Sequence, residues 1–303
     1  MAADLFRDTR GILIESIWWD ARTDEVVWVD ITAGTIHRGR WDGAVDGSDD
    51  RVIELPPPVS AVQPATGGGY VAALKDRVVL LDAAGGITRD LAALPHRHDG
   101  IRLNEGKVDP FGRFVVGAMD LSADDPDAGL YAVGADGFPR TLLGGFGITN
   151  GLEWNDDGSV MFVTDTMTRT VYRGAYGPDG DLGELEPFLV GRMSDGLVRA
   201  ADGSFFNGIY GDGVVVHWGA DGGVLGERTI PVPNVTSVAF AGPALDVLLV
   251  GTARENLSED ALSQHPLSGG IFRLDTGATG LPVHTFGEDH SASDDDLHDS
   301  KEN

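Results

Sequence analysis

Six polar residues recur along the chain at nearly constant spacing, each among largely apolar neighbours. Successive members lie 45, 44, 46, 45 and 42 residues apart. They are Glu15, Ser60, Asn104, Asn150, Asp195 and Ser237. Two are carboxylates and two are amides, and such oxygen atoms are the ligands that Ca²⁺, Mg²⁺ or Mn²⁺ prefers. If the fold gathers these positions, they predict a site for one divalent cation. Ca²⁺ is the expected ion, and Mg²⁺, Mn²⁺ or the less suited Zn²⁺ is compatible.

The same residues also allow a purely structural interpretation. Polar side chains in many folds cap strand ends or bind internal water. That explanation suits a single asparagine. It suits two acids in one ring less well, because crowded carboxylates are costly unless a cation offsets their charge. We therefore favour the metal site.

An internal repeat indicates how these residues are positioned. A constant offset of 135 residues superposes residues 15–38 on residues 150–173 without a gap. The matched pairs are Glu15 with Asn150, Trp19 with Trp154, Asp30 with Asp165, and Arg38 with Arg173. Because 135 is three times 45, two further units must lie between these copies. A period of 40 to 50 residues that contains short strands is typical of a β-propeller.

Turns and strands within each unit support this architecture. Asn104, Asn150 and Asp195 each precede a glycine by eight residues, in the turns DPFG, NDDG and AADG. β-Prone runs such as FVVGAM and VMFVTD follow these turns. About four strands per unit make a propeller blade, and ring closure protects the sheet edges. The sequence thus predicts an all-β, six-bladed β-propeller.

The prediction extends to domain limits and to chain closure. Residues 1–286 should form one propeller, with a strand from residues 5–14 completing the last blade. Ser258 should cap a short helix inserted in that blade. Residues 287–303 should form an acidic, disordered tail, because seven acids face Lys301 alone there. In a propeller the innermost strand of each blade faces the central channel, so the six repeated residues should converge in that channel.

Composition excludes several classes of function. The net charge is −26, so nucleic acid and anionic membranes are not expected partners. The chain has no cysteine, which rules out disulfides, thiolate metal sites and a cysteine nucleophile. The N-terminal residues lack an apolar core of a signal peptide, and nowhere do 18 apolar residues run together, so a cytoplasmic protein is expected. The oligomeric state is left open.

Five segments carry a specific resemblance. They are IRLNEGKVDPFGRFVVGAM (101–119), TNGLEWNDDGSVMFVTDT (149–166), SDGLVRAADG (194–203), NVTSVAFAGPALDVLLVGTA (234–253) and PLSGGIFRLDTGATGLP (266–282). In these segments the chain resembles the senescence marker protein (regucalcin) and gluconolactonase family of six-bladed propellers, from about Glu15 to Phe286.

The resemblance implies a function and a set of site residues. It implies that Glu15, Asn150 and Asp195 bind the metal, and that Arg102 and Asn104 contact substrate. It also implies a metal-dependent hydrolase that opens sugar lactones, with a small-molecule sugar lactone as partner. In such a reaction Asp195, an anionic ligand beside the attacking water, is the expected catalytic base. The family usually has Glu-Gly-Pro where this chain has Glu15, Ser16 and Ile17, and Asp where it has Glu105. Blade five diverges as well.

Two other functions remain open at this point. Diisopropyl fluorophosphatase, a phosphotriester hydrolase, is similar in holding calcium in a propeller channel with Glu, Asn, Asn and Asp. A calcium-binding propeller without turnover is the other alternative. Among the remaining signals, His96 and His98 are expected in a solvated loop, and Asp120 has a minor claim to contact sugar hydroxyls. Asp30 and Asp165 are expected to make hydrogen bonds in turns.

Overall fold

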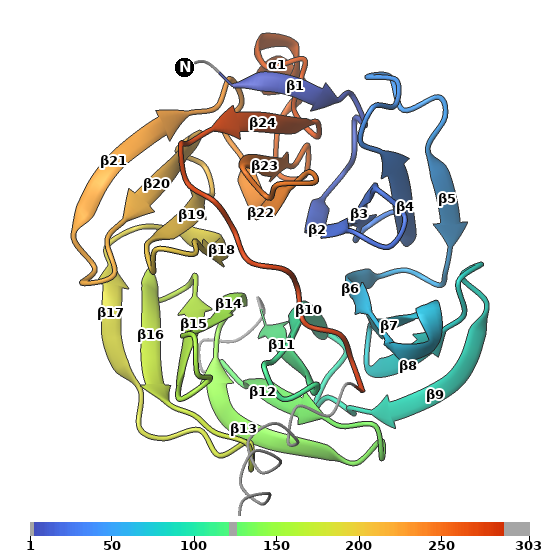
Figure 1. The fold of residues 1–303 in the computed structure, drawn as a ribbon, viewed down its shortest axis with the longest axis vertical. Coiled ribbons are helices and arrows are strands. Elements are labelled where there is room, and N and C mark those ends of the chain that lie inside the picture. Colours follow the sequence, from blue (N-terminus) through green and yellow to red (C-terminus); the bar gives the residue numbers. More distant parts are fainter. Residues whose placement is uncertain (1–2, 121–125, 288–303) are drawn as a thin grey trace, which may run out of the picture.

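Short β-prone runs separated by glycine-containing turns pair into antiparallel sheets in this chain. The structure, a computed structural model, describes residues 3–120 and 126–287. There, six four-stranded sheets surround a central axis as the blades of a β-propeller (Figure 1). The predicted all-β, six-bladed architecture is confirmed. The predicted tail lies outside the described residues except for Gly287.

Blades one to three follow one another along the chain, each from its innermost to its outermost strand. Blade one contains β2 (Ile14–Asp20), β3 (Glu25–Asp30), β4 (Thr35–Arg40) and β5 (Arg51–Glu54). Blade two contains β6 (Val59–Pro64), β7 (Tyr70–Leu74), β8 (Arg77–Leu81) and β9 (Ile87–Ala93), with a short 3₁₀ turn, η1 (Thr66–Gly68). Blade three contains β10 (Ile101–Val108), β11 (Phe114–Asp120), β12 (Ala128–Val133) and β13 (Pro139–Phe146).

Blades four and five repeat this order, and blade six closes the ring. Blade four contains β14 (Thr149–Trp154), β15 (Val160–Asp165), β16 (Thr170–Ala175) and β17 (Glu186–Val190). Blade five contains β18 (Ser194–Arg199), β19 (Phe205–Ile209), β20 (Val214–Trp218) and β21 (Val224–Thr229). Blade six contains β22 (Val235–Ala241), β23 (Val247–Thr252), β24 (Ile271–Asp275) and, as its outermost strand, β1 (Asp4–Arg7) from the other end of the chain.

Closure of the ring depends on β1, at the start of the region where the sequence predicted a closing strand. Arg7 of this strand is buried and forms an ion pair with Asp50 of the loop between β4 and β5, at 3.2 Å. Its guanidinium also donates to the backbone oxygens of Arg40 and Gly43. Blade six is therefore tied to blade one by side-chain contacts as well as by the covalent connection.

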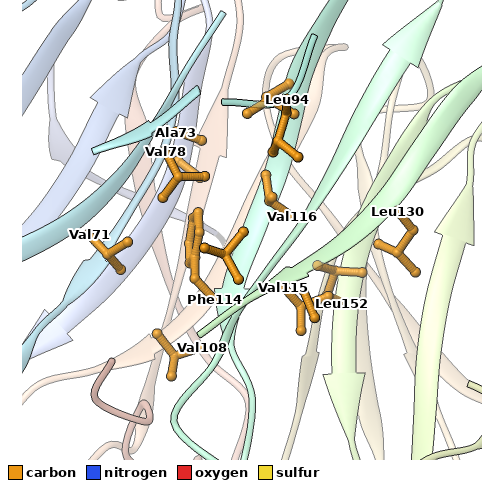
Figure 2. Close-up of a cluster of buried hydrophobic side chains, with 14 of the residues drawn as sticks. Val71, Ala73, Val78, Leu94, Val108, Phe114, Val115, Val116, Leu130 and Leu152 are labelled. Carbon is orange, nitrogen blue, oxygen red and sulfur yellow. The ribbon is translucent and has the colours of Figure 1, made fainter. Parts of the chain in front are cut away.

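The core lies between neighbouring blades, because both faces of the inner strands are buried. On β11, Phe114 and Val116 point toward blade two, where they lie beside Val71 and Val78, whereas Val115 points toward Leu152 of blade four (Figure 2). Alternation along a single strand thus joins three blades.

Every inner strand carries an irregularity in its pairing at the repeated polar residue. The register shifts between Glu15 and Trp18 in β2, and between Asn150 and Leu152 in β14. Equivalent shifts interrupt the pairing of β6, β10, β18 and β22 with their neighbours. A β-bulge changes the direction of the side chain at that point. The six bulges are therefore the local feature that turns this ring of residues toward the channel.

The segment after β24 covers one end of the channel. It crosses the centre of the ring in Figure 1. It pairs with blade five through Gly280 and Ala200, and with blade two through Phe286 and Ala65. The helix predicted in blade six is present as α1 (Glu259–Gln264), and Ser258 Oγ caps it by accepting from the Ala261 amide. In the described part of the chain, no helix is long and apolar enough to cross a membrane.

Candidate active site

The six repeated residues lie near the start of their inner strands, at the channel end opposite the C-terminal segment. Their side chains are all buried. Asn104 Nδ2 donates to Asn150 Oδ1 at 2.8 Å, so blades three and four meet here. Burial raises the pKa of Glu15, and the negative charge of Asp195 raises it further. The side chains of Glu15 in blade one and Asp195 in blade five therefore lie close enough to interact. The predicted convergence is therefore observed for Glu15, Asn104, Asn150 and Asp195.

Glu15 and Asp195 are two buried acids that face each other. Burial raises the pKa of Asp195 to about 8, and the negative charge of Glu105 adds to the effect. Burial raises the pKa of Glu15 well above its ordinary value, followed by the effects of Asp195 and Glu105. Glu15 Oε2 and Asp195 Oδ1 have no hydrogen-bond partner in the part of the chain that the structure describes. The guanidinium of Arg102 lowers both pKa values but does not outweigh burial, so a further cation would favour the ionised form of both carboxylates.

Thr166 orients the amide of Asn150. Asn150 Nδ2 donates to Thr166 Oγ1 at 2.9 Å, and the Thr166 hydroxyl donates to the Ser194 carbonyl at 2.6 Å. Because Thr166 Oγ1 uses its only proton on Ser194, it must accept from the NH₂ group of Asn150. The carbonyl oxygen of Asn150 is thereby directed toward the channel, where it can serve as a metal ligand.

Arg102 and Asn104 form a chain of hydrogen bonds that ends on Asn150. Arg102 Nη1 donates to Asn104 Oδ1 at 2.7 Å and to the Leu103 carbonyl at 2.9 Å. Asn104 Nδ2 donates to the Thr149 carbonyl and to Asn150. Asn104 therefore links the predicted substrate-binding arginine to a predicted metal ligand.

The residues present fit a divalent cation. Glu15, Asp195 and Asn150 offer two carboxylates and one amide oxygen, which is a hard donor set with net negative charge. Orphaned carboxylate oxygens, named above, are what a missing cation would leave. Among the described residues no group of three or more His, Asp or Glu is arranged to hold a metal, so the amide is essential to this set.

The remaining ring positions, Ser60 and Ser237, take structural roles. Ser237 Oγ accepts from the Ile17 amide at 3.1 Å, which joins blade six to blade one. Ser60 Oγ lies 3.4 Å from the carbonyl oxygen of Ala73 within its own blade. The structural interpretation that the sequence left open thus applies to these two serines.

Ser16, where the family usually has glycine, has a positive φ of 50° within the bulge of β2. Its Oγ donates to the Val62 carbonyl at 3.1 Å and accepts from the Val62 amide at 3.0 Å. A non-glycine residue in this conformation is uncommon. The two hydrogen bonds to blade two account for its accommodation here. Glu105, the second departure, is buried in the channel and accepts from the Gly106 amide.

Two hollows lie at opposite ends of the channel. One, of about 410 Å³, borders Arg102, Met119, Lys75 and the loop Pro57–Pro58; Glu15, Asn150 and Asp195 do not line it. The other, of about 460 Å³, is lined by residues one to six positions further along the chain than the repeated residues, among them Gln63, Lys107 and Trp154, and by residues 281–284. Because a strand advances roughly 3.3 Å per residue and the C-terminal segment borders this hollow, it lies at the channel end away from the candidate ligands. Of the two, the hollow beside Arg102 lies at the ligand end of the inner strands.

Secondary signals from the sequence have plain structural explanations. His98 Nε2 lies 3.2 Å from Asp120 Oδ2, and His96 Nε2 lies 3.0 Å from the Lys75 carbonyl, in the loop before β10. Asp30 accepts from the amides of Ile12, Leu13 and Ala33. Asp165 makes the equivalent bonds in blade four. The turn role expected for these two aspartates is confirmed.

Sequence reasoning missed Thr166, Tyr210 and Glu255. Thr166 is the last residue of the recognised segment TNGLEWNDDGSVMFVTDT (149–166), so its position in the repeat could have identified it. Tyr210 and Glu255 come from loops at the ligand end of blades five and six, where the sequence has no repeated pattern. Their contacts appear only when the blades are closed into a ring.

Comparison with known proteins identifies the family of this chain. The chain belongs to the SMP-30/gluconolactonase/LRE-like family, whose model matches residues 13–254. A 6-deoxy-6-sulfogluconolactonase of Pseudomonas putida is 31% identical over 91% of this chain and 95% of that protein. A pentonolactonase of Haloferax volcanii is 33% identical over 91% and 94%. The solved structure of regucalcin, a calcium-binding protein of Agrobacterium tumefaciens, has a TM-score of 0.87 and 26% identity over 94% of this chain and 97% of that one.

Proposed function

We propose that this chain is a metal-dependent hydrolase that opens sugar lactones. The observation that carries the proposal is the buried pair Glu15 and Asp195, whose orphaned oxygens lie in one channel with the oriented carbonyl of Asn150. Membership of the family and the lactonases among its relatives support the reaction class.

A bound divalent cation would supply Lewis-acid catalysis, which polarises the lactone carbonyl and lowers the pKa of water. The residues of the chain would do the rest. Asp195 would accept the proton of the attacking water, because its carboxylate lies at the ring beside the proposed cation. Arg102 would orient the carbonyl or hydroxyls of the substrate with the donors that it does not use on Leu103 and Asn104.

The substrate class follows from the polarity of this end of the channel. Ring and exocyclic hydroxyls of a sugar lactone both donate and accept, so they match the charged and amide groups that lie there. A simple aliphatic lactone would leave those buried groups unpaired, which is strongly unfavourable. Relatives that open a sulfogluconolactone and a pentonolactone are consistent with sugar lactones as a class.

The proposal is tested by a substrate panel on protein that has been stripped of metal. Aldonolactones, simple γ-lactones and a phosphotriester are offered after reloading with Ca²⁺, Mg²⁺, Mn²⁺ or Zn²⁺, and proton release is followed. We expect fastest opening of aldonolactones and recovery of activity only with metal. Preference for the phosphotriester would instead support the fluorophosphatase-type reaction. Metal binding without turnover of any compound would support a non-enzymatic propeller.

Variants separate the proposed roles. Asn104→Ala should reduce turnover more than metal content, whereas Asp195→Ala should abolish both. Asp156→Asn, which removes an exposed acid at the other end of the channel, is the matched control and should retain both. Loss of turnover in Asp195→Ala with full metal content would contradict the assignment of Asp195 as a ligand.

A further inference from the structure

Glu255 lies above the boundary between blades six and one, at the end of the channel that holds the candidate ligands. Ala253, two residues before it, pairs with Leu13, which is two residues before Glu15. The amide of Glu255 donates to the Ile12 carbonyl at 2.9 Å. Glu255 therefore belongs to the rim of the candidate active site, although the repeat does not include it.

Hydrogen bonds hold Glu255 in one orientation. Its carbonyl accepts from Asn234 Nδ2 at 2.9 Å and from the Tyr210 hydroxyl at 3.3 Å. Thr32 Oγ1 donates to its Oε1 at 2.7 Å. Within residues 3–120 and 126–287 the other carboxylate oxygen has no hydrogen-bond donor, and the side chain is only partly buried. A fixed carboxylate with one free oxygen is suited to accept a hydrogen bond from a ligand.

The carboxylate of Glu255 interacts electrostatically with the guanidinium of Arg102. Burial lowers the pKa of Arg102, and three carboxylates oppose this effect, with Glu255 ahead of Glu15 and Asp195. Only Nη1 of Arg102 has hydrogen-bond partners in the described part of the chain. The rim thus presents a carboxylate and a guanidinium to one ligand, each with unused hydrogen-bonding atoms.

Tyr210 completes the same side of the rim. Its hydroxyl accepts from Asn234 Nδ2 at 3.1 Å and from Asn256 Nδ2 at 3.0 Å. Burial raises the pKa of Tyr210, and the carboxylates of Asp195, Glu255 and Glu15 raise it further. The phenol therefore stays neutral near these acids and buttresses Glu255.

We propose that Glu255 is a specificity residue that, opposite Arg102, selects neutral polyhydroxylated lactones and rejects lactones bearing a second, acidic group. This inference rests on the proposed lactonase function. A carboxylate accepts hydrogen bonds from hydroxyl groups but repels an additional carboxylate, and such like-charge contacts strongly disfavour the wrong ligand. Glu255 places a negative charge at the rim, where the side chain distal to the lactone ring would lie.

The test uses two substrates that differ in one group. Glucono-1,4-lactone ends in a hydroxymethyl group, whereas glucaro-1,4-lactone carries a carboxylate at that position. We expect metal-loaded wild-type protein to prefer the neutral lactone at least about tenfold in kcat/KM, and Glu255→Gln to raise kcat/KM for the acidic lactone about tenfold while changing that for the neutral one less than about threefold. Glu259→Gln removes the same charge from exposed α1 nearby and should keep the wild-type ratio.

A structural role would give a different result. If Glu255 only held the loop, Glu255→Gln would lower kcat/KM for both lactones to the same extent. An unchanged ratio of the two kcat/KM values would overturn the inference. Added salt provides a second readout. It should narrow the wild-type preference, because it screens the repulsion of the acidic lactone, but leave the ratio of Glu255→Gln nearly constant. A wild-type ratio that does not respond to salt would also count against the inference.

A binding measurement separates this inference from the proposed function. Methyl β-glucoside and methyl β-glucuronide differ by the same hydroxymethyl-to-carboxylate change and contain no lactone. If the protein opens neither lactone, the proposed function fails. Calorimetric titration with these glycosides then still tests whether Glu255 selects the neutral ligand. Tighter binding of the glucoside that is lost in Glu255→Gln would support selection by Glu255. Equal binding of both compounds to wild-type protein would refute it.

Discussion

The acidic side chains in the channel are buried, and some of their carboxylate oxygens accept no hydrogen bond from the described residues. Glu15 and Asp195 each have a carboxylate oxygen that no described residue satisfies. Asn150 has its amide direction fixed by Thr166. Such contacts orient a metal ligand, and their removal typically lowers metal affinity about 10- to 100-fold. Thr166 is thus the positioning residue of this candidate site.

Removal of the Thr166 hydroxyl should weaken metal binding while the protein remains folded. In Thr166→Val the NH₂ group of Asn150 loses its acceptor, so the amide can rotate away from the channel. We expect the dissociation constant for the cation to rise roughly tenfold. Thr170→Val, which removes a largely buried hydroxyl on β16 that donates to Thr168, is the control and should bind metal normally. Calorimetric titration measures both variants, and equal affinities would exclude the orienting role.

The raised pKa of Asp195, about 8, makes the stability of metal-free protein depend on pH. The folded state holds a proton on this acid that the unfolded chain releases at its ordinary pKa near 4. The favourable contribution is therefore complete at low pH and is lost as pH rises toward about 8. Asp195→Asn has no such proton, so with a chelator present its stability relative to wild type should increase from about pH 5 to pH 8. Urea unfolding at several pH values tests this, and parallel profiles would contradict it.

The inner strands convert a one-dimensional repeat into a ring. Each contains a bulge at the repeated polar residue. Close approach of adjacent inner strands is also required. A Cβ on Gly196, the residue after Asp195, would lie 2.7 Å from the Thr236 carbonyl and 2.9 Å from Ser237 Cα. Backbone cannot move aside cheaply, so glycine is needed where β18 meets β22.

Gly196→Ala should therefore affect both the fold and the site. We expect the free energy of unfolding to fall by about 2 kcal/mol, within the range for overpacking a dense interior. Metal affinity should fall as well, because the displaced backbone carries Asp195. Gly226→Ala on outer strand β21 is the control, since its Cβ would meet only the Arg228 side chain at 3.7 Å. Denaturant unfolding and metal titration of both variants check the prediction, which fails if they behave alike.

The closed ring explains what could be predicted from the sequence and what could not. Periodic features were accessible, because blades repeat: the spacing of Glu15, Asn150 and Asp195 placed the inner strands and the channel. Contacts between blades were not accessible, because they join residues that no local pattern relates. Arg7 with Asp50, Ser16 with Val62, and Tyr210 with Asn234 are of this kind. Thr166 lies between these cases, since it ends a recognised segment but makes a hydrogen bond across a blade boundary, to Ser194.

The net charge of −26 should govern the response of the molecule to salt. At this charge the folded chain repels itself, and monovalent salt screens that repulsion. We expect the melting temperature of metal-loaded protein to rise steadily as sodium chloride is increased from about 0.05 M to 1 M, over which the Debye length falls from above 10 Å to about 3 Å. Thermal unfolding at fixed pH and metal concentration measures this. A melting temperature that is flat or falls with salt would contradict the expectation.

Metal content is the most direct test of the central claim, a single divalent cation held by Glu15, Asn150 and Asp195. Wild-type protein, Glu15→Ala and the control Asp156→Asn are loaded with Ca²⁺, passed through a desalting column and measured by elemental analysis, with circular dichroism to confirm that each is folded. The account predicts about one ion per chain in wild type and control, and almost none in folded Glu15→Ala. Equal metal content in wild type and Glu15→Ala would contradict it.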